Sequence, residues 1–160
     1  MSDMFDAKVA LFHKDADGKF EALELLANEL ISSGVAKSSF YDGIKEREKV
    51  FPTGLSLNKM CVAIPHTDPE HVNRTQIGFI SLNKPVEFIE MGTEDKKIGV
   101  TMMFMLCLKE AHEQIDMLMK LMDMFQNDDL MDRFAAVDNY EDYFKLIEEA
   151  GLNKGEDKQC

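Results

Sequence analysis

The spacing of apolar residues predicts two helices near the start of the chain. From Phe20 to Ile31 apolar residues recur three or four positions apart, which is the spacing of one face of an α-helix. The Asp-Ala-Asp-Gly turn at 15–18 can cap this helix, and Gly34 ends it. A shorter helix is expected from Ser39 to about Glu48. The segment Val9–His13 before them is predicted to be a short strand.

Extended segments dominate the middle of the chain. Met60–Ile64 has the length and composition of one buried strand. Arg74–Leu82 and Val86–Met91 flank Asn83-Lys84-Pro85, so a strand–turn–strand unit is expected there. Ile98–Leu108 is almost uninterrupted apolar sequence. Such a run is typical of a central strand that is covered on both faces.

From residue 111 the apolar period changes to that of helices. One face of the first of these helices is predicted to consist of Ile115, Leu118, Met119, Met122 and Phe125. An aspartate at 128 or 129 can cap a short helix that runs to Ala136. Asp138 can cap a last helix, with Tyr143, Phe144 and Ile147 on its inner face and Gly151 at its end.

Helices and strands therefore mix along the chain. This order predicts an α/β fold, with a mixed β-sheet of about five strands flanked by helices on both faces. A length of 160 residues with 45% apolar composition fits one domain with a real core. We expect that domain to span residues 1–152, and we expect the polar segment 153–160 to be a disordered tail.

The charge balance narrows the range of partners. A formal net charge of −12 and a pI near 4.7 argue against nucleic acid and anionic membranes, because both attract a basic surface. The start of the chain lacks the features of a signal peptide, and the longest apolar run, Met102–Leu108, is too short to cross a bilayer. Cys61, Cys107 and Cys160 show no CxxC spacing, so reduced cysteines are expected. These features predict a cytoplasmic protein without membrane insertion.

The segment Ala63-Ile64-Pro65-His66 places a histidine directly after a buried strand. Pro65 fixes its own φ and favours an extended Ile64, so His66 is held stiffly at the mouth of a loop. A histidine in such a place can act as a nucleophile if one ring nitrogen keeps its proton and the other is free. The alternative is a surface histidine without a special role.

Three further groups could surround a phosphoryl group on His66. Arg47 has the planar fork that suits phosphate oxygens, although Glu46 and Glu48 beside it could instead pair with it on the surface. The Phe51-Pro52-Thr53-Gly54 turn offers the Thr53 hydroxyl, or serves as a turn and nothing more. His112 stands beyond the long strand in the first turn of a helix, where anions are favoured, or it bonds locally.

Other site types have weaker support. His66 and His71, with Asp68 and Glu70 between them, could hold a metal ion, but the loop has no helical register and no cysteine pair. Neither GxxxxGK[ST] nor GxGxxG occurs, so no nucleotide loop is predicted and phosphoryl chemistry would proceed without ATP. We therefore expect no metal and no cofactor.

Taken together, Arg47-Glu48, Phe51-Pro52-Thr53-Gly54 and Ala63-Ile64-Pro65-His66 resemble the EIIA component of the sugar phosphotransferase system, in its mannitol/fructose superfamily. The Phe-Pro-Thr-Gly and Ile-Pro-His segments are most similar to the galactitol-type branch, and the resemblance spans about residues 5–150. It implies that the domain is an EIIA domain in which His66 is phosphorylated. It also implies that Arg47 and a second histidine, His112, lie at the phosphate. Many family members have glycine where this chain has Thr67, whose hydroxyl is a further candidate phosphate ligand.

The resemblance also implies a relay between proteins. An EIIA component takes a phosphoryl group from HPr, the small phosphocarrier protein, and gives it to a cysteine of its EIIB, which serves the membrane transporter EIIC. For this chain a phosphotransferase in the uptake of galactitol or a related polyol is expected. Two alternatives stay open, namely a regulatory module whose phosphorylation at His66 controls a partner protein, and a metal-binding module.

Overall fold

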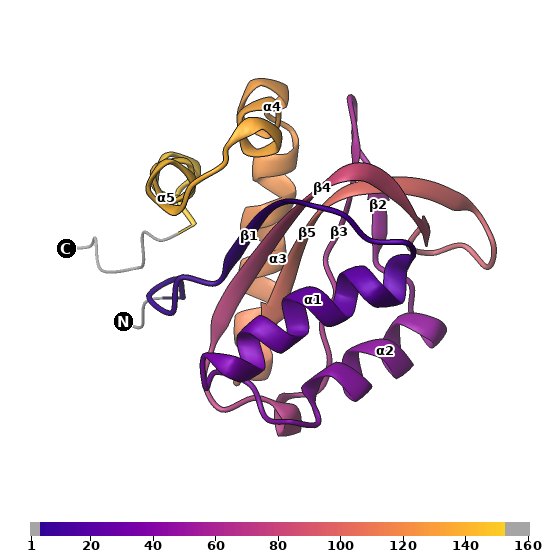
Figure 1. The fold of residues 1–160 in the computed structure, drawn as a ribbon, viewed down its shortest axis with the longest axis vertical. Coiled ribbons are helices and arrows are strands. Elements are labelled where there is room, and N and C mark those ends of the chain that lie inside the picture. The colour runs from indigo at the N-terminus through magenta and orange to yellow at the C-terminus, as the bar shows by residue number, and fades with distance from the viewer. Residues whose placement is uncertain (1–3, 153–160) are drawn as a thin grey trace.

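One mixed sheet with helices on both of its faces makes up the fold (Figure 1). The computed structural model describes residues 4–152. The strands are β1 (Ala10–Lys14), β2 (Gly54–Ser56), β3 (Cys61–Ala63), β4 (Gln76–Ile89) and β5 (Lys97–Cys107). The helices are α1 (Lys19–Ser32), α2 (Phe40–Val50), α3 (Ala111–Phe125), α4 (Asp128–Ala136) and α5 (Tyr140–Ala150), with a 3-10 turn at Pro69–His71.

The strand order is β1-β4-β5-β3-β2, which puts β5 in the middle of the sheet. β1 runs parallel to β4 and β3 runs parallel to β5, whereas the pairs β4–β5 and β2–β3 are antiparallel. The predicted mixed sheet of five strands and the predicted central strand are both confirmed. The predicted tail at 153–160 lies outside the described residues.

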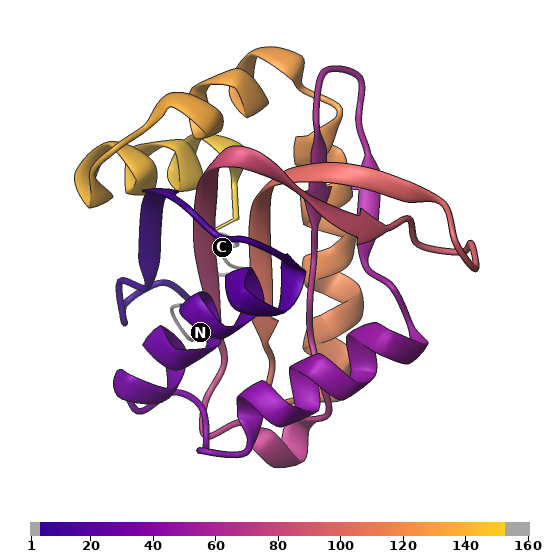
Figure 2. The same cartoon turned by 45° about the vertical axis from the view of Figure 1, so that its right-hand side comes forward.

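Alternation along β5 builds two separate cores, because successive side chains of a strand point to opposite faces. Met102, Phe104 and Leu106 pack with residues of α3, α4 and α5. Met103, Met105 and Cys107 pack with residues of α1 and α2 on the other face. Figure 2 shows α1 and α2 on the near side of the sheet and α3 behind it. The nearly continuous apolar run at 98–108 follows from this double coverage.

Two predictions for the middle of the chain were wrong. The expected strand–turn–strand unit is one long strand, β4, because β5 pairs with it on both sides of a register shift between Ser81 and Val86. Pro85 lies inside that shift, where its missing N–H removes no regular hydrogen bond between the strands. The expected turn at 52–54 leads at once into β2, a strand of three residues that was missed because it is too short to show a period.

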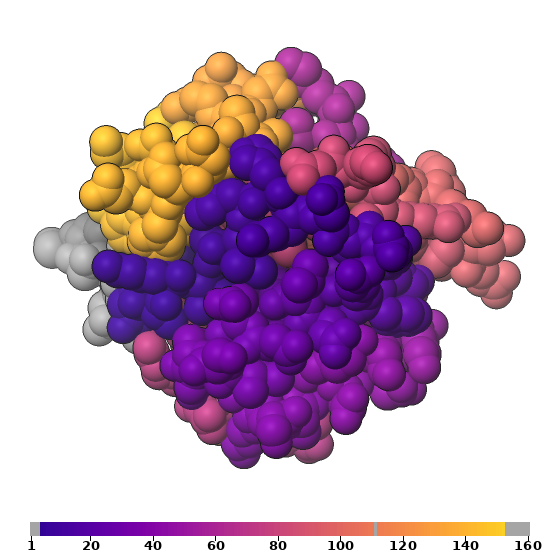
Figure 3. Space-filling model, in the orientation of Figure 1, coloured from indigo at the N-terminus to yellow at the C-terminus, as the bar shows by residue number. Residues whose placement is uncertain are grey.

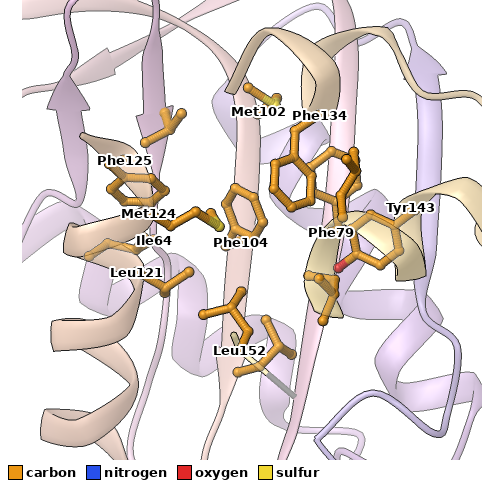
Figure 4. Packing of buried hydrophobic residues seen from close by; sticks show 14 of the residues in the cluster. Ile64, Phe79, Met102, Phe104, Leu121, Met124, Phe125, Phe134, Tyr143 and Leu152 are labelled. Carbon is orange, nitrogen blue, oxygen red and sulfur yellow. The ribbon is translucent and has the colours of Figure 1, made fainter. Parts of the chain in front are cut away.

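The face predicted for α3 was only partly right, since Phe125 is buried but most of the face is not turned to the sheet. Ile115 is 64% exposed and Met119 is 65% exposed, and Met122 is exposed as well. The buried residues of α3 are Met117, Leu121, Met124 and Phe125. Figure 4 shows Leu121, Met124 and Phe125 reaching from α3 toward Ile64 and Phe104 on the sheet. The helix is apolar on two sides, so its sequence pattern alone did not identify the buried one.

The remaining helix ends agree with the predictions to within two residues. Asn127 and Asn139 are the N-caps of α4 and α5, each accepting a hydrogen bond from a backbone N–H three residues on, at 3.0 and 2.9 Å. The aspartates expected to cap these helices lie one or two residues away. Gly151 ends α5 with a φ of 80°, and Gly34 follows α1 with a φ of 84°. Within residues 4–152, no helix combines the length and the apolarity needed to cross a bilayer.

The turn between β4 and β5 projects from the body of the molecule. Figure 3 shows this segment standing out at the right, while α1 and α2 cover much of the visible face. At the base of the turn, Gly54 pairs with Glu90, and the Met91 N–H donates to the Gly54 carbonyl at 2.7 Å. The edge strand β2 is therefore fastened to this turn.

Replacing Gly54 by alanine is expected to destabilise the fold. A Cβ at this position would lie 2.8 Å from the Ile89 carbonyl oxygen, a backbone atom that cannot rotate away. Overpacking of this kind costs about 1–3 kcal/mol, which for a chain of this size lowers Tm by roughly 3–10 °C. Thermal unfolding followed by circular dichroism measures the shift. Gly18→Ala is the control, since a Cβ there meets nothing within 4 Å, and equal Tm values for both variants would contradict the prediction.

Candidate functional site

His66 lies just beyond the end of β3, where the chain still runs beside the central strand. The Leu106 N–H donates to the Pro65 carbonyl at 2.9 Å, and His66 forms an isolated parallel bridge with Leu106. On the other side, the Ile64 N–H donates to the Thr53 carbonyl at 3.2 Å. The backbone that carries the half-buried imidazole is therefore held from two neighbouring segments, as expected from the strand and proline before it.

The imidazole of His66 is fixed in one tautomer. Its Nδ1 lies 3.0 Å from the Ile64 carbonyl oxygen. A carbonyl can only accept, so Nδ1 carries the proton and donates it. In the neutral ring Nε2 then has a free lone pair, which is the form that a nucleophilic histidine needs.

Burial lowers the pKa of His66 below its ordinary value of 6.5, and the positive charge of Arg47 lowers it further. The hydrogen bond to Ile64 and the charge of Asp68 act in the opposite direction without reversing the shift. A lowered pKa means that the ring is neutral near neutral pH and gains a proton only in more acidic solution. The free lone pair is thus available under ordinary conditions.

An NMR titration of the histidine ring protons is expected to give His66 a pKa below 6.5. In Arg47→Met the pKa should rise, because the methionine keeps most of the bulk but removes the repelling charge. Lys49→Met is the matched control, as it removes a charge from an exposed position of the same helix. An unchanged pKa in Arg47→Met would show that Arg47 does not act on the ring.

His66 borders a hollow of about 390 Å³ that several separate segments enclose. The end of α2 and residues 51–53 form one wall, the β4–β5 turn at 91–93 forms a second, and α3 forms a third. The lining residues with polar side chains are Arg47, Thr53, His66, Thr93 and Gln114. A larger hollow of about 570 Å³ lies at α5, but its described lining holds neither histidine nor arginine. The chemistry therefore points to the smaller hollow.

Arg47 lines this hollow together with His66, and it is not paired with a neighbouring carboxylate. Its guanidinium carbon lies 4.8 Å from the centre of the Phe51 ring. Its Nε is buried without a hydrogen-bond partner among residues 4–152. Glu46 pairs instead with Lys49 at 3.2 Å. A buried donor without a partner costs free energy, and an anion entering the hollow would satisfy it.

Thr53 borders the hollow, but its donors are engaged elsewhere. Its N–H and its hydroxyl each donate to the Glu48 carboxylate at 2.8 Å. Glu48 is only 2% exposed, and burial raises its pKa. This buried carboxylate fixes the turn after α2, so the structure gives Thr53 a role in holding the wall. The sequence offered no signal for it, since Glu48 lies in a run of charged residues.

Thr67 and His71 border a second hollow of about 320 Å³, which shares Arg47, Val50 and Phe51 with the first. The Ser39 hydroxyl and His71 Nδ1 lie 2.8 Å apart, and His71 Nε2 lies 3.6 Å from Glu70. No three histidine, cysteine or acidic side chains between residues 4 and 152 are grouped so that they could hold a metal ion.

The structure does not bring His112 into the hollow. His112 is exposed in the first turn of α3, whereas Gln114 and Leu118 of the same helix line the hollow beside His66. Gln114 was missed because glutamine is common on helix surfaces and carries no titratable group. Its spacing of about two helical turns from Leu121 places both residues on one side of α3, but the sequence did not show that this side is the buried one.

Comparison with known protein families identifies the family of this chain. Residues 3–150 match the model of the EIIA 2 family of the phosphoenolpyruvate-dependent sugar phosphotransferase system. The chain belongs to this family. The family predicted from Arg47-Glu48 and the two motifs that follow is therefore confirmed.

Curated relatives of this EIIA chain are of the galactitol and mannitol types. It is 26% identical to the galactitol-specific EIIA component of Escherichia coli K12 over 117 residues, which is 73% of this chain and 77% of the relative. It is 26% identical to the mannitol-specific enzyme IIA component of Staphylococcus aureus over 151 residues, which is 94% of this chain and 99% of the relative.

The fold of this EIIA chain also occurs in a solved complex. Enzyme IIA for mannitol from Escherichia coli, in complex with phosphorylated enzyme IIB, superimposes with a TM-score of 0.71 at 19% identity. The match covers 88% of this chain and 94% of that one. At this identity the match establishes the shared fold.

Proposed function

We propose that this EIIA chain is a phosphoryl carrier whose acceptor is Nε2 of His66. The donor is phospho-HPr, and the acceptor of the second transfer is a cysteine of a cognate EIIB that serves an EIIC transporter. The cargo is a sugar or polyol of the galactitol type, as the relative from Escherichia coli suggests. The observation that carries the proposal is the Nδ1–H bond to Ile64, which leaves Nε2 as a free nucleophile beside Arg47.

The transfer needs no cofactor. Nε2 attacks phosphorus in line with the donor's P–N bond, and the electron pair of that bond returns to the donor nitrogen. The Nδ1 proton stays on the ring, held by the Ile64 carbonyl. In the second step the P–Nε2 bond breaks and a thiolate sulfur takes the phosphoryl group. The protein's task is to position the group and to neutralise its oxygens, and the Arg47 guanidinium is suited to the latter.

Exposed apolar side chains around the hollow support docking of protein partners. Val50 is 66% exposed and Phe51 is 57% exposed at the end of α2, and Met91 is exposed on the β4–β5 turn. Ile115, Met119 and Met122 continue this surface along α3. Apolar patches of this kind mark interaction sites, and methionine adapts to more than one partner. A carrier must accept two different proteins at one site, so such a surface fits the role.

Charge complements the apolar contacts. The chain carries a net charge of −12, and Asp116 and Asp123 are exposed beside the apolar side chains of α3. A partner with a basic rim, such as an HPr with an arginine near its phosphohistidine, would be attracted. The mannitol-specific enzyme IIA from Escherichia coli, which shares this fold, was solved in complex with phosphorylated enzyme IIB, and this supports an EIIB as one of the partners.

The test is a reconstituted relay. Purified chain is incubated with phospho-HPr, the phosphorylated residue is identified by mass spectrometry under alkaline conditions, and EIIB is then added. We expect phosphate on His66 first and on the EIIB cysteine afterwards. Phosphate on another residue, or none, would refute the proposal. Phosphate on His66 that never moves to EIIB but alters the binding of another protein would establish the regulatory alternative.

A further inference from the structure

Gln114 occupies the position on α3 that faces the hollow. It lies about two helical turns before Leu121, which places it on the buried side of the helix. His112 lies about two and a half turns before Leu121, and therefore on the opposite side. The solvent exposures agree, since Gln114 is half-buried and His112 is exposed. Packing of α3 on the sheet thus turns Gln114 toward His66 and His112 away from it.

The side-chain amide of Gln114 has no hydrogen-bond partner among residues 4–152. It borders the same hollow as the unpartnered Arg47 Nε and the free Nε2 of His66. Two groups with unused donors therefore lie around one nucleophile. A phosphoryl group bonded to the nucleophile carries oxygens that accept from such donors.

We propose that the Gln114 amide donates a hydrogen bond to the phosphoryl group during its transfer to and from His66. It takes the part that family resemblance assigned to His112. The inference rests on the proposed function and names a further catalytic residue for it. In this step the P–N bond of the donor breaks and the P–Nε2 bond forms. The Gln114 amide only donates a hydrogen bond, so it keeps both of its hydrogens and transfers no proton.

A neutral amide in this position predicts a different pH dependence of the transfer rate than a histidine would. Its hydrogen-bonding capacity does not change with pH, because an amide does not titrate. The contribution of Gln114 to the rate should therefore be constant from about pH 6 to 9, across the range in which a histidine would change its charge. The pH dependence of the rate therefore distinguishes an amide that binds the phosphoryl group from a histidine that does so.

Initial rates of phosphorylation by phospho-HPr test the inference. Gln114→Ala should slow transfer about tenfold or more, the loss typical of a hydrogen bond to a charged group, with full phosphorylation of His66 at the end point. The ratio of wild-type to variant rates should not change with pH. Gln114→Glu, which keeps the size but replaces the donor with a repelling carboxylate, should be slower still. His112→Ala is the matched control on the same helix and should stay within about twofold of wild type.

The second readout is the lifetime of the phosphorylated protein. Loss of a ligand to the phosphoryl group should change the hydrolysis rate of phospho-His66, which a merely structural role would leave unchanged. Alanine is a good helix former, so Gln114→Ala should retain the wild-type Tm.

Wild-type rates and lifetime in Gln114→Ala, or an equal loss in His112→Ala, would overturn the inference and leave the carrier role of His66 intact. A wild-type protein that is never phosphorylated at His66 would overturn the proposed function itself.

Discussion

Replacing His66 by alanine is expected to abolish phosphorylation by phospho-HPr. The proposed acceptor is the Nε2 lone pair, and no other described residue offers a ring nitrogen in the same hollow. The incorporated phosphate should fall below about 1% of the wild-type level, since a lost nucleophile is not replaced by its surroundings. Incorporation measured with radiolabelled phosphoenolpyruvate and the general enzymes of the system gives this number directly.

Two controls separate chemistry from folding in this experiment. His66→Gln keeps a polar side chain that can donate to the Ile64 carbonyl, yet lacks the imidazole, so it should be folded and equally inactive. His71→Ala removes the histidine of the adjacent hollow and should still be phosphorylated. Full phosphorylation of His66→Ala would falsify the assignment, and loss in His71→Ala alone would move the acceptor to that residue.

Arg47→Met is expected to slow phosphoryl transfer about 100-fold or more without removing the acceptor. Arg47 supplies the positive charge of the hollow, and its buried Nε has a donor left unused. Removing one preorganised donor from a site of developing charge typically costs about 10²–10³ in rate. Single-turnover transfer from phospho-HPr measures the effect. Arg47→Lys should recover part of the rate, because lysine keeps the charge but not the planar fork.

The matched control for Arg47 is Lys49→Met. It changes the net charge by the same amount on the same helix, but Lys49 is exposed and pairs with Glu46. We expect its rate within about twofold of wild type. If Lys49→Met slows transfer as much as Arg47→Met does, the effect belongs to overall charge and to attraction of HPr. Raising the ionic strength would then remove it.

The candidate site was predicted best where its geometry is local. His66 follows a strand and a proline, and the carbonyl that fixes its tautomer belongs to Ile64, two residues away. Arg47 was predicted as a candidate, yet its neighbouring glutamates suggested a surface pair. The structure shows the opposite, because Glu48 turns inward to Thr53 and leaves Arg47 to stack on Phe51. That outcome depends on how the turn at 51–53 folds back on α2.

The fold, like the candidate site, was predicted where it follows from local sequence patterns. The central strand follows from a nearly continuous apolar run, and the helices follow from apolar residues at a spacing of about 3.6. The mixture of helices and strands along the chain predicts the mixed sheet. The three-residue strand β2 and the continuous strand β4 did not follow, since one is too short for a period and the other contains a register shift.

The amino-acid sequence by itself determined the family, the central strand, the helices and the place of a stiffly held histidine just after a strand. Only the tertiary structure decided which side of α3 is buried. That helix has apolar residues on two sides, so burial of Leu121 and Met124 against the sheet could not be deduced from its period. This choice exposes Ile115 and Met119 at a surface fit for partners, and it sets Gln114, in place of His112, beside His66.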